Sequence, residues 1–119
     1  MSRCRVTSLG AMNPLTAEDQ KLVTLARATM ARTRAIEGAA VRDLDGRTYA
    51  AAAVDLPSLR LAALEVCVAM AFASGSRGLE SAVRLGGEGT PDLSAVREFA
   101  GEGVVVHLGD AGGRVTGTA

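Results

Sequence analysis

Residues 59–74 form the most apolar stretch of the sequence, and this stretch most constrains the fold. It is too short for a membrane span and contains Arg60 and Glu65, so it favours a buried helix. Ser58 is a typical N-cap residue before it, and Gly75 is a typical residue at its end. Because the predicted helix is apolar almost all round, we expect it to be covered on more than one side, within the domain or by another copy.

The core must be built mainly from Ala, Val and Leu, because the chain has no Trp, one Tyr and two Phe. Hydrophobic residues make up 48% of the sequence, which excludes a disordered chain. A length of 119 residues is enough for one domain and too short for two. We therefore expect a single domain over residues 14–119, preceded by a flexible leader over residues 1–13.

The charge and the cysteines narrow the possible partners and location. Because the formal net charge is zero and aromatic residues are scarce, we expect no binding to nucleic acid or to membranes. Cys4 and Cys67 lie far apart in the sequence, which argues against a disulfide framework. The first residues lack the apolar segment of a secretory signal, so we expect a cytoplasmic protein with reduced thiols.

The spacing of apolar residues predicts the order helix, hairpin, helix, strand, helix, hairpin. Thr16 and Asp19 form a capping pattern at the start of the first helix, which ends near Arg34. Expected strands cover residues 38–42, 47–54, 79–85, 104–108 and 114–118, and expected helices cover residues 16–34, 59–74 and 92–99. This order predicts the α/β class, as a three-layer α/β/α sandwich with a mixed sheet of about five strands.

Several short segments occur in an order that is typical of one protein family. They are residues 35–41 (AIEGAAV), the turn at residues 45–46, residues 53–56 (AVDL), residues 59–64 (LRLAAL), residues 95–99 (AVREF) and the turn at residues 110–113. In this order the chain resembles the nucleoside cytidine deaminases, whose motifs F-x-V-G-A-A-V, N-V-E-N, L-T-L-C-A-E and V-L-R-E-F stand at these places. The resemblance spans roughly residues 17–118 and implies the cytidine deaminase-like fold.

The resemblance also implies that the residues for the family's chemistry are absent. Those deaminases hold zinc with a Cys or His from C-A-E and two Cys from P-C-x-x-C, and the Glu of C-A-E moves protons between the metal-bound water and the base. Here Ala62 stands at the first ligand position, Leu64 at the Glu position, and residues 90–94 (TPDLS) replace the second motif. We therefore expect no catalytic residue, no metal ligand and no cofactor.

The remains of a substrate cleft are expected at five positions by the same resemblance. They are Ala35, in place of the Phe that lines the base pocket, Ala53, in place of the Asn that binds ribose, its shortened acidic neighbour Asp55, and Ala62 and Glu65 on the helix. A register shifted by one residue would align C-A-E with residues 63–65 and keep the glutamate, yet it restores no zinc ligand. For Glu65 we weigh a polar contact at the core edge against a ligand contact or catalysis, and favour the first.

Other candidate sites have little support in the sequence. Cys4, Cys67 and His107 are the only soft metal donors, and we expect Cys67 to be a buried apolar residue and His107 a hydrogen-bonded structural one. The glycine-rich segment at residues 86–89 lacks the Lys-Ser/Thr that follows a phosphate-binding loop.

These observations favour a non-catalytic cytidine deaminase-like protein that acts through assembly or partner binding. We expect a homo-oligomer, dimer or tetramer, or a hetero-oligomer with an active relative, and Leu64→Arg or Ala69→Arg should break it. A nucleoside- or nucleotide-binding module that uses the vestigial cleft is the first alternative. A cytidine deaminase-type hydrolase with misaligned ligands is the second.

Overall fold

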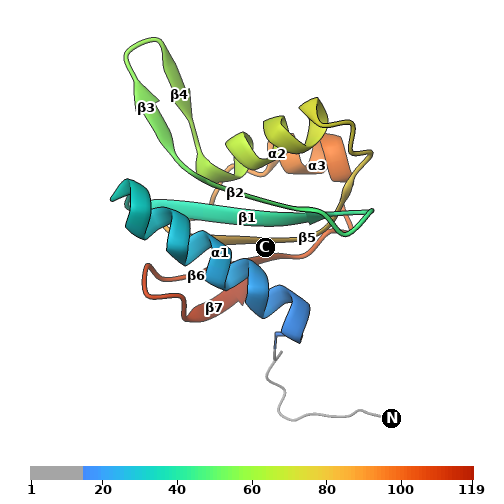
Figure 1. Ribbon diagram of the computed structural model, residues 1–119, viewed down its shortest axis with the longest axis horizontal. Coiled ribbons are helices and arrows are strands. Elements are labelled where there is room, and N and C mark those ends of the chain that lie inside the picture. Colours follow the sequence, from blue (N-terminus) through green and yellow to red (C-terminus); the bar gives the residue numbers. More distant parts are fainter. Residues whose placement is uncertain (1–14) are drawn as a thin grey trace.

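The computed structural model describes residues 15–119 and confirms the predicted three-layer α/β/α sandwich (Figure 1). Its elements are α1 (Ala17–Thr33), β1 (Glu37–Asp43), β2 (Thr48–Ala52), β3 (Val54–Leu56), β4 (Leu59–Leu61), α2 (Ala63–Ala73), β5 (Leu79–Gly86), α3 (Ser94–Ala100), β6 (Val106–Gly109) and β7 (Val115–Thr118). The five-stranded sheet has the order β2-β1-β5-β6-β7, and β3 and β4 form a separate pair. The sheet is mixed, because β5 and β6 are parallel whereas its other neighbours are antiparallel. The expected leader lies outside the described residues.

Two cores lie on opposite faces of this sheet. Successive side chains of a strand point to opposite faces. Accordingly, Ala39 and Val41 of β1 pack in the core beneath α2 and α3, whereas Ala40 packs with Leu22 and Ala26 of α1. Small strand residues let the helices approach closely, which is what a core poor in aromatic residues requires.

Helix α1 begins and ends close to the predicted positions. The Oγ1 of Thr16 accepts a hydrogen bond from the backbone N–H of Asp19 at 3.0 Å, as an N-cap should. The helix stops at Arg34, which adopts the left-handed conformation with φ 58°. Its buried residues face β1, β2 and β5, so α1 covers one face of the sheet.

The predictions of a strand over residues 47–54 and of a helix from residue 59 are wrong. Strand β2 ends at Ala52, and the chain then forms the β3–β4 hairpin, in which Leu56 pairs with Leu59 and Val54 with Leu61. Pro57 and Ser58 form its turn, so Ser58 does not cap α2. Helix α2 begins only at Ala63.

The β3–β4 hairpin projects from the body of the molecule (Figure 1). Its leucines are largely open to solvent, with exposed fractions of 55% for Leu56 and 48% for Leu59. Helix α2 follows directly and packs on β1 and β2. No helix within residues 15–119 is both long enough and apolar enough to cross a membrane.

Candidate functional site

Two carboxylates hold the amino end of α2. The N-cap position is Ala62, whose methyl group cannot accept a hydrogen bond. Instead, Glu65 Oε1 accepts from the backbone N–H of Ala62 at 2.8 Å, and Glu37 Oε1 accepts from that of Ala63 at 2.9 Å. Negative charge is favourable at this end of a helix, because the free backbone N–H groups carry partial positive charge. Both carboxylates are therefore engaged by the helix that they stabilise.

Arg84 of β5 completes this group, and we call Glu37, Glu65 and Arg84 the Glu37–Arg84 cluster. Arg84 is only 4% exposed, and its Nε lies 3.8 Å from Glu37 Oε2. Its guanidinium donates to the carbonyl oxygen of Gly86 and, at 2.6 Å, to that of Gly89. Arg84 thus joins Glu37 to the loop that precedes α3, and it neutralises a carboxylate in a half-buried position.

Because Gly87 has no side chain, Arg84 and Glu37 can occupy the space beside it. A Cβ at this position would lie 2.7 Å from both Arg84 Nη1 and Glu37 Oε2, which is closer than non-bonded atoms allow. Gly87 also has φ +72°, a conformation that favours glycine. Any larger residue would therefore displace the ion pair.

The cluster lies between the two segments that the sequence relates to the zinc motifs. Glu37 and Glu65 bond to the backbone at Ala62 and Ala63, and Arg84 bonds to Gly89, immediately before the TPDLS segment. The alanines offer no donor to a metal. Within the part of the chain that the structure describes, no group of three or more His, Cys, Asp or Glu could hold a metal ion. The residues present therefore do not fit a zinc centre.

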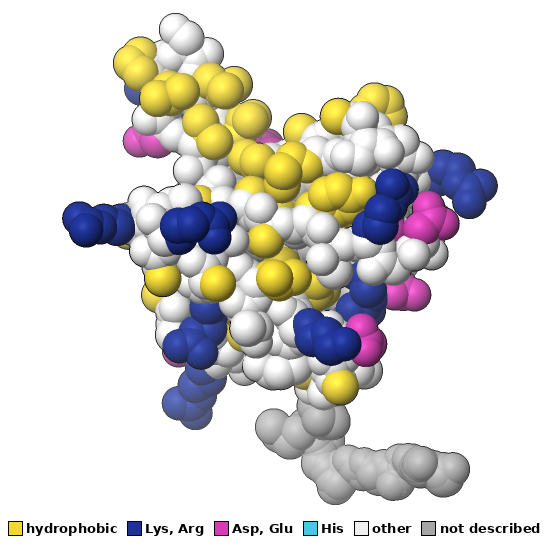
Figure 2. Space-filling model, in the orientation of Figure 1, with side chains coloured by type: hydrophobic (Ala, Val, Ile, Leu, Met, Phe, Trp, Pro, Cys, Tyr) yellow, Lys and Arg dark blue, Asp and Glu magenta, His cyan; other side chains and the backbone are white. Residues whose placement is uncertain are grey.

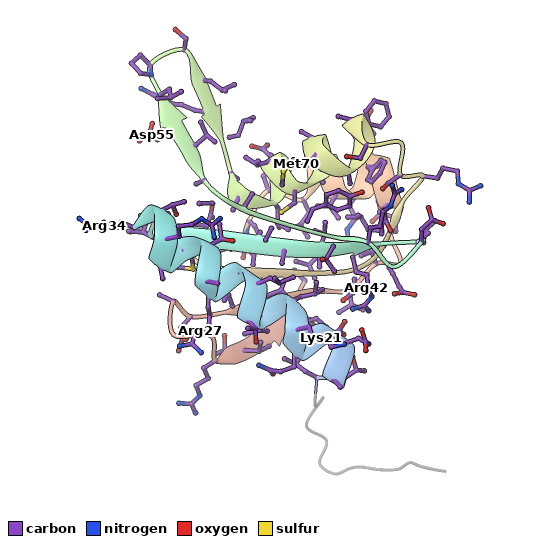
Figure 3. All side chains as sticks on the ribbon, viewed as in Figure 1. Lys21, Arg27, Arg34, Arg42, Asp55 and Met70 are labelled. Carbon is purple, nitrogen blue, oxygen red and sulfur yellow. The ribbon has the colours of Figure 1, made fainter. Side chains whose placement is uncertain are left out.

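The structure brings three of the five predicted cleft residues to this cluster. Glu65 belongs to it, and the backbone N–H of Ala62 donates to Glu65 Oε1 at 2.8 Å. The backbone N–H of Ala53 donates to the carbonyl oxygen of Glu37 at 3.3 Å. Asp55 instead lies on the β3–β4 hairpin (Figure 3), with an 86% exposed side chain paired to Arg60 at 3.3 Å. The backbone N–H of Ala35 donates to Met30.

Sequence reasoning missed Glu37 and Arg84. A signal was present, because Glu37 stands where the family motif F-x-V-G has its apolar third residue. Arg84 is likewise a charged residue among apolar neighbours, since residues 82, 83 and 85 of its strand are Ala, Val and Leu. Opposite charges on two neighbouring buried strands are expected to form an ion pair, because an unpaired buried charge is costly.

A second polar cluster lies on the opposite face of the sheet. Asp19 Oδ1 accepts from Arg42 Nη2 at 3.0 Å, and Asp19 Oδ2 lies 3.2 Å from His107 Nε2. Burial alone would raise the pKa of Asp19, but the neighbouring Ser81, Arg42 and His107 side chains outweigh burial and lower it. The cluster ties α1 to the sheet, so His107 is a hydrogen-bonded structural residue.

Three cavities are lined by other residues. One of about 540 Å³ lies between α2 and α3, and others of about 360 and 280 Å³ lie beside Gly109 and beside His107. None of the three has Ala35, Ala53, Asp55, Ala62 or Glu65 in its wall.

The protein is an α/β protein in which a mixed sheet lies between helices. Its candidate site lies at the amino end of α2, the helix that follows the β3–β4 hairpin. The family model for cytidine deaminase-like proteins matches residues 15–113, so the chain belongs to that family.

Solved cytidine deaminases share the fold. The enzyme from Burkholderia pseudomallei has a TM-score of 0.71 at 23% identity, over 88% of this chain and 92% of its own. The enzyme from Mycobacterium leprae has 0.64 at 19%, over 78% and 89%. That from Mycobacterium tuberculosis has 0.64 at 21%, over 76% and 85%. No curated protein matches the sequence.

Proposed function

We propose that this chain is a non-catalytic member of the family that acts through assembly or partner binding. The observation that carries the proposal is the Glu37–Arg84 cluster. Deamination by this family's chemistry needs a metal-activated water and a carboxylate free to move protons. Here methyl groups stand at Ala62 and Ala63, and Glu65 is hydrogen bonded to the helix that carries it. These contacts support the proposal, because the side chains of the cluster bond to each other and to the end of α2 rather than standing free for a substrate.

The test is zinc content together with deamination. We expect untagged, purified protein to carry less than about a tenth of an equivalent of zinc per chain, because it lacks thiol and imidazole ligands here. Cytidine should not be converted to uridine, while a zinc-loaded cytidine deaminase assayed in parallel converts it. About one zinc per chain together with turnover would sink the proposal and favour the hydrolase with misaligned ligands.

We propose a second copy of the chain as the partner. An isolated two-stranded hairpin is marginal in water, so the projecting β3–β4 hairpin with Leu56 and Leu59 is expected to be covered. Figure 2 shows hydrophobic side chains along this hairpin and continuing toward α2. Ala69 of α2 is also exposed. The continuity of these surfaces supports one interface across both elements.

The prediction that Leu64→Arg would probe the interface is wrong, because Leu64 is buried within the chain itself. Leu64 is only 1% exposed and packs in the chain's own core, so Leu64→Arg would disrupt folding.

Ala69→Arg remains a valid probe of the interface, and Ala28→Arg on the exposed face of α1 is its matched control. Light scattering after size exclusion should give a dimer or tetramer for wild type and Ala28→Arg, and a monomer for Ala69→Arg. A monomeric wild type would refute assembly.

None of the three cavities described above lies at the cleft that the nucleoside-binding alternative would use. An increase in the melting temperature of the protein with millimolar cytidine or uridine would support that alternative.

A further inference from the structure

The cavity between α2 and α3 is separate from the Glu37–Arg84 cluster and shares no residue with it. Its volume of about 540 Å³ lies within the range of small-molecule sites. Val68, Phe72, Ser76, Arg77, Ala95, Glu98 and Phe99 line it. The wall is therefore mostly apolar, with one positive and one negative side chain, and it offers room for a compact organic molecule.

The two phenylalanines of the chain form part of this wall. Their rings meet edge to face, with centroids 6.0 Å apart and planes at 81°. Phe72 is nevertheless 70% exposed, so most of its ring remains available. A flat or branched apolar group placed against these rings would bury surface that now faces water, and aromatic contacts add to that gain.

The two charges on the wall are of opposite sign and do not neutralise each other. Arg77 and Glu98 are both exposed, and within residues 15–119 neither makes an ion pair with the other or with a third group. A ligand with one charge would satisfy one side chain and repel the other. A phosphate ester would bring negative charge toward Glu98. A zwitterion satisfies both.

We propose that this cavity binds a free α-amino acid with an aromatic or large aliphatic side chain. Its carboxylate pairs with Arg77, its ammonium group with Glu98, and its side chain packs against Phe72 and Phe99. The guanidinium group suits a carboxylate because it can donate two parallel hydrogen bonds. This inference does not rest on the absence of catalysis or on assembly.

L-tryptophan is the appropriate probe. Because the chain contains no Trp, indole emission reports the probe alone. Its fluorescence anisotropy should rise on titration with protein, with a dissociation constant of about 0.1–1 mM, as expected for a ligand of this size in an open site. Tryptamine, which lacks the carboxylate, and indole-3-propionate, which lacks the ammonium group, should each bind at least about fivefold more weakly, because each loses one charge-assisted contact.

Three variants assign the contacts, and circular dichroism checks their folding. Arg77→Gln should weaken the binding of L-tryptophan and indole-3-propionate and strengthen that of tryptamine, because the repulsion between two positive charges is removed. Glu98→Gln should weaken the binding of L-tryptophan and tryptamine and strengthen that of indole-3-propionate, because the repulsion between two negative charges is removed. Phe72→Ala should weaken all three probes. Arg27→Gln, on the exposed side of α1, is the control and should change none.

Two results would overturn the proposal. One is an unchanged anisotropy of L-tryptophan at millimolar protein. The other is equal affinity for the three indoles, unaffected by Arg77→Gln and Glu98→Gln, which would mark the cavity as an apolar face for another protein surface.

Discussion

Asp43 illustrates at the scale of one residue how a buried charge can stabilise this fold. Its Oδ1 accepts from the backbone N–H groups of Asp45 and Arg47, each at 2.9 Å. Its Oδ2 accepts from Arg47 Nε at 3.1 Å, from Tyr49 Oη at 3.2 Å and from Ser76 Oγ. Burial alone would raise the pKa of Asp43, but these hydrogen bonds, with Ser76 the strongest, lower it to about 2.

We predict that Asp43→Asn lowers the free energy of unfolding at pH 7 by about 2–4 kcal/mol, because the amide group that replaces Oδ2 cannot accept from Arg47. Urea denaturation measures the change. Asp45→Asn, whose side chain is 55% exposed, is the control and should cost no more than about 0.5 kcal/mol. Equal effects of the two substitutions would show that the network around Asp43 contributes little.

The same residue predicts a pH dependence. Its pKa is lower in the folded state than the ordinary value of 3.8, so the folded state binds fewer protons. The stability that Asp43 contributes is therefore fully present above about pH 4 and is lost as the pH falls toward about 2. The stability difference between wild type and Asp43→Asn should shrink over this range in urea titrations. A difference that stays constant from pH 7 to pH 2.5 would contradict the assignment.

At the scale of elements, local patterns predicted most of the fold and failed at the start of α2. Helix α1 was predictable because Thr16 caps it and its apolar residues recur at helical spacing. Residues 59–61 are also apolar, and a short apolar run does not distinguish a strand from a helix. The start at Ala63 depends on Glu37, a residue of another element.

The candidate site was less predictable for the same reason. Resemblance located Ala53, Ala62 and Glu65, which do come together. The pairing of Glu37 with Arg84 depends on which strands are neighbours, namely β1 and β5, and periodicity carries no such information. Asp55 lies apart from them on the β3–β4 hairpin, which the sequence pattern did not predict.

The bare N-cap of α2 gives a prediction for that element. Ala62 has the extended backbone of an N-cap, φ −69° and ψ 157°, without a capping side chain. Ala62→Ser should therefore raise the free energy of unfolding by about 0.5–1 kcal/mol, because its hydroxyl can accept from a backbone N–H of the first turn. Ala69→Ser, an exposed position inside the same helix, should lower it slightly, since serine is a poorer helix former than alanine. Urea denaturation of both variants is the measurement, and a destabilising Ala62→Ser would show that Glu37 and Glu65 already saturate the helix end.

At the scale of the whole molecule, the sheet separates two cores that share no side chain. Val23 belongs to the core under α1, and Val68 and Val96 belong to the core under α2 and α3. We predict that Val23→Ala and Val96→Ala, each costing about 1–3 kcal/mol, add within about 0.5 kcal/mol in the double variant.

The matched comparison is the pair Val68→Ala and Val96→Ala, which alters a single core and should depart further from additivity. Urea denaturation of the two double variants and their parents measures both coupling energies. A coupling across the sheet above about 1 kcal/mol would show that the strands transmit strain between the two faces.

Separate cores also bear on how such a chain can change over generations. The cluster at the amino end of α2 lies on one face, whereas the contacts of Asp19 with Arg42 and His107 lie on the other. Where the two cores respond independently, as predicted above, substitutions on the first face need no compensating substitution beneath α1. A family built on this fold can therefore vary the residues of one side while the other side keeps the same architecture.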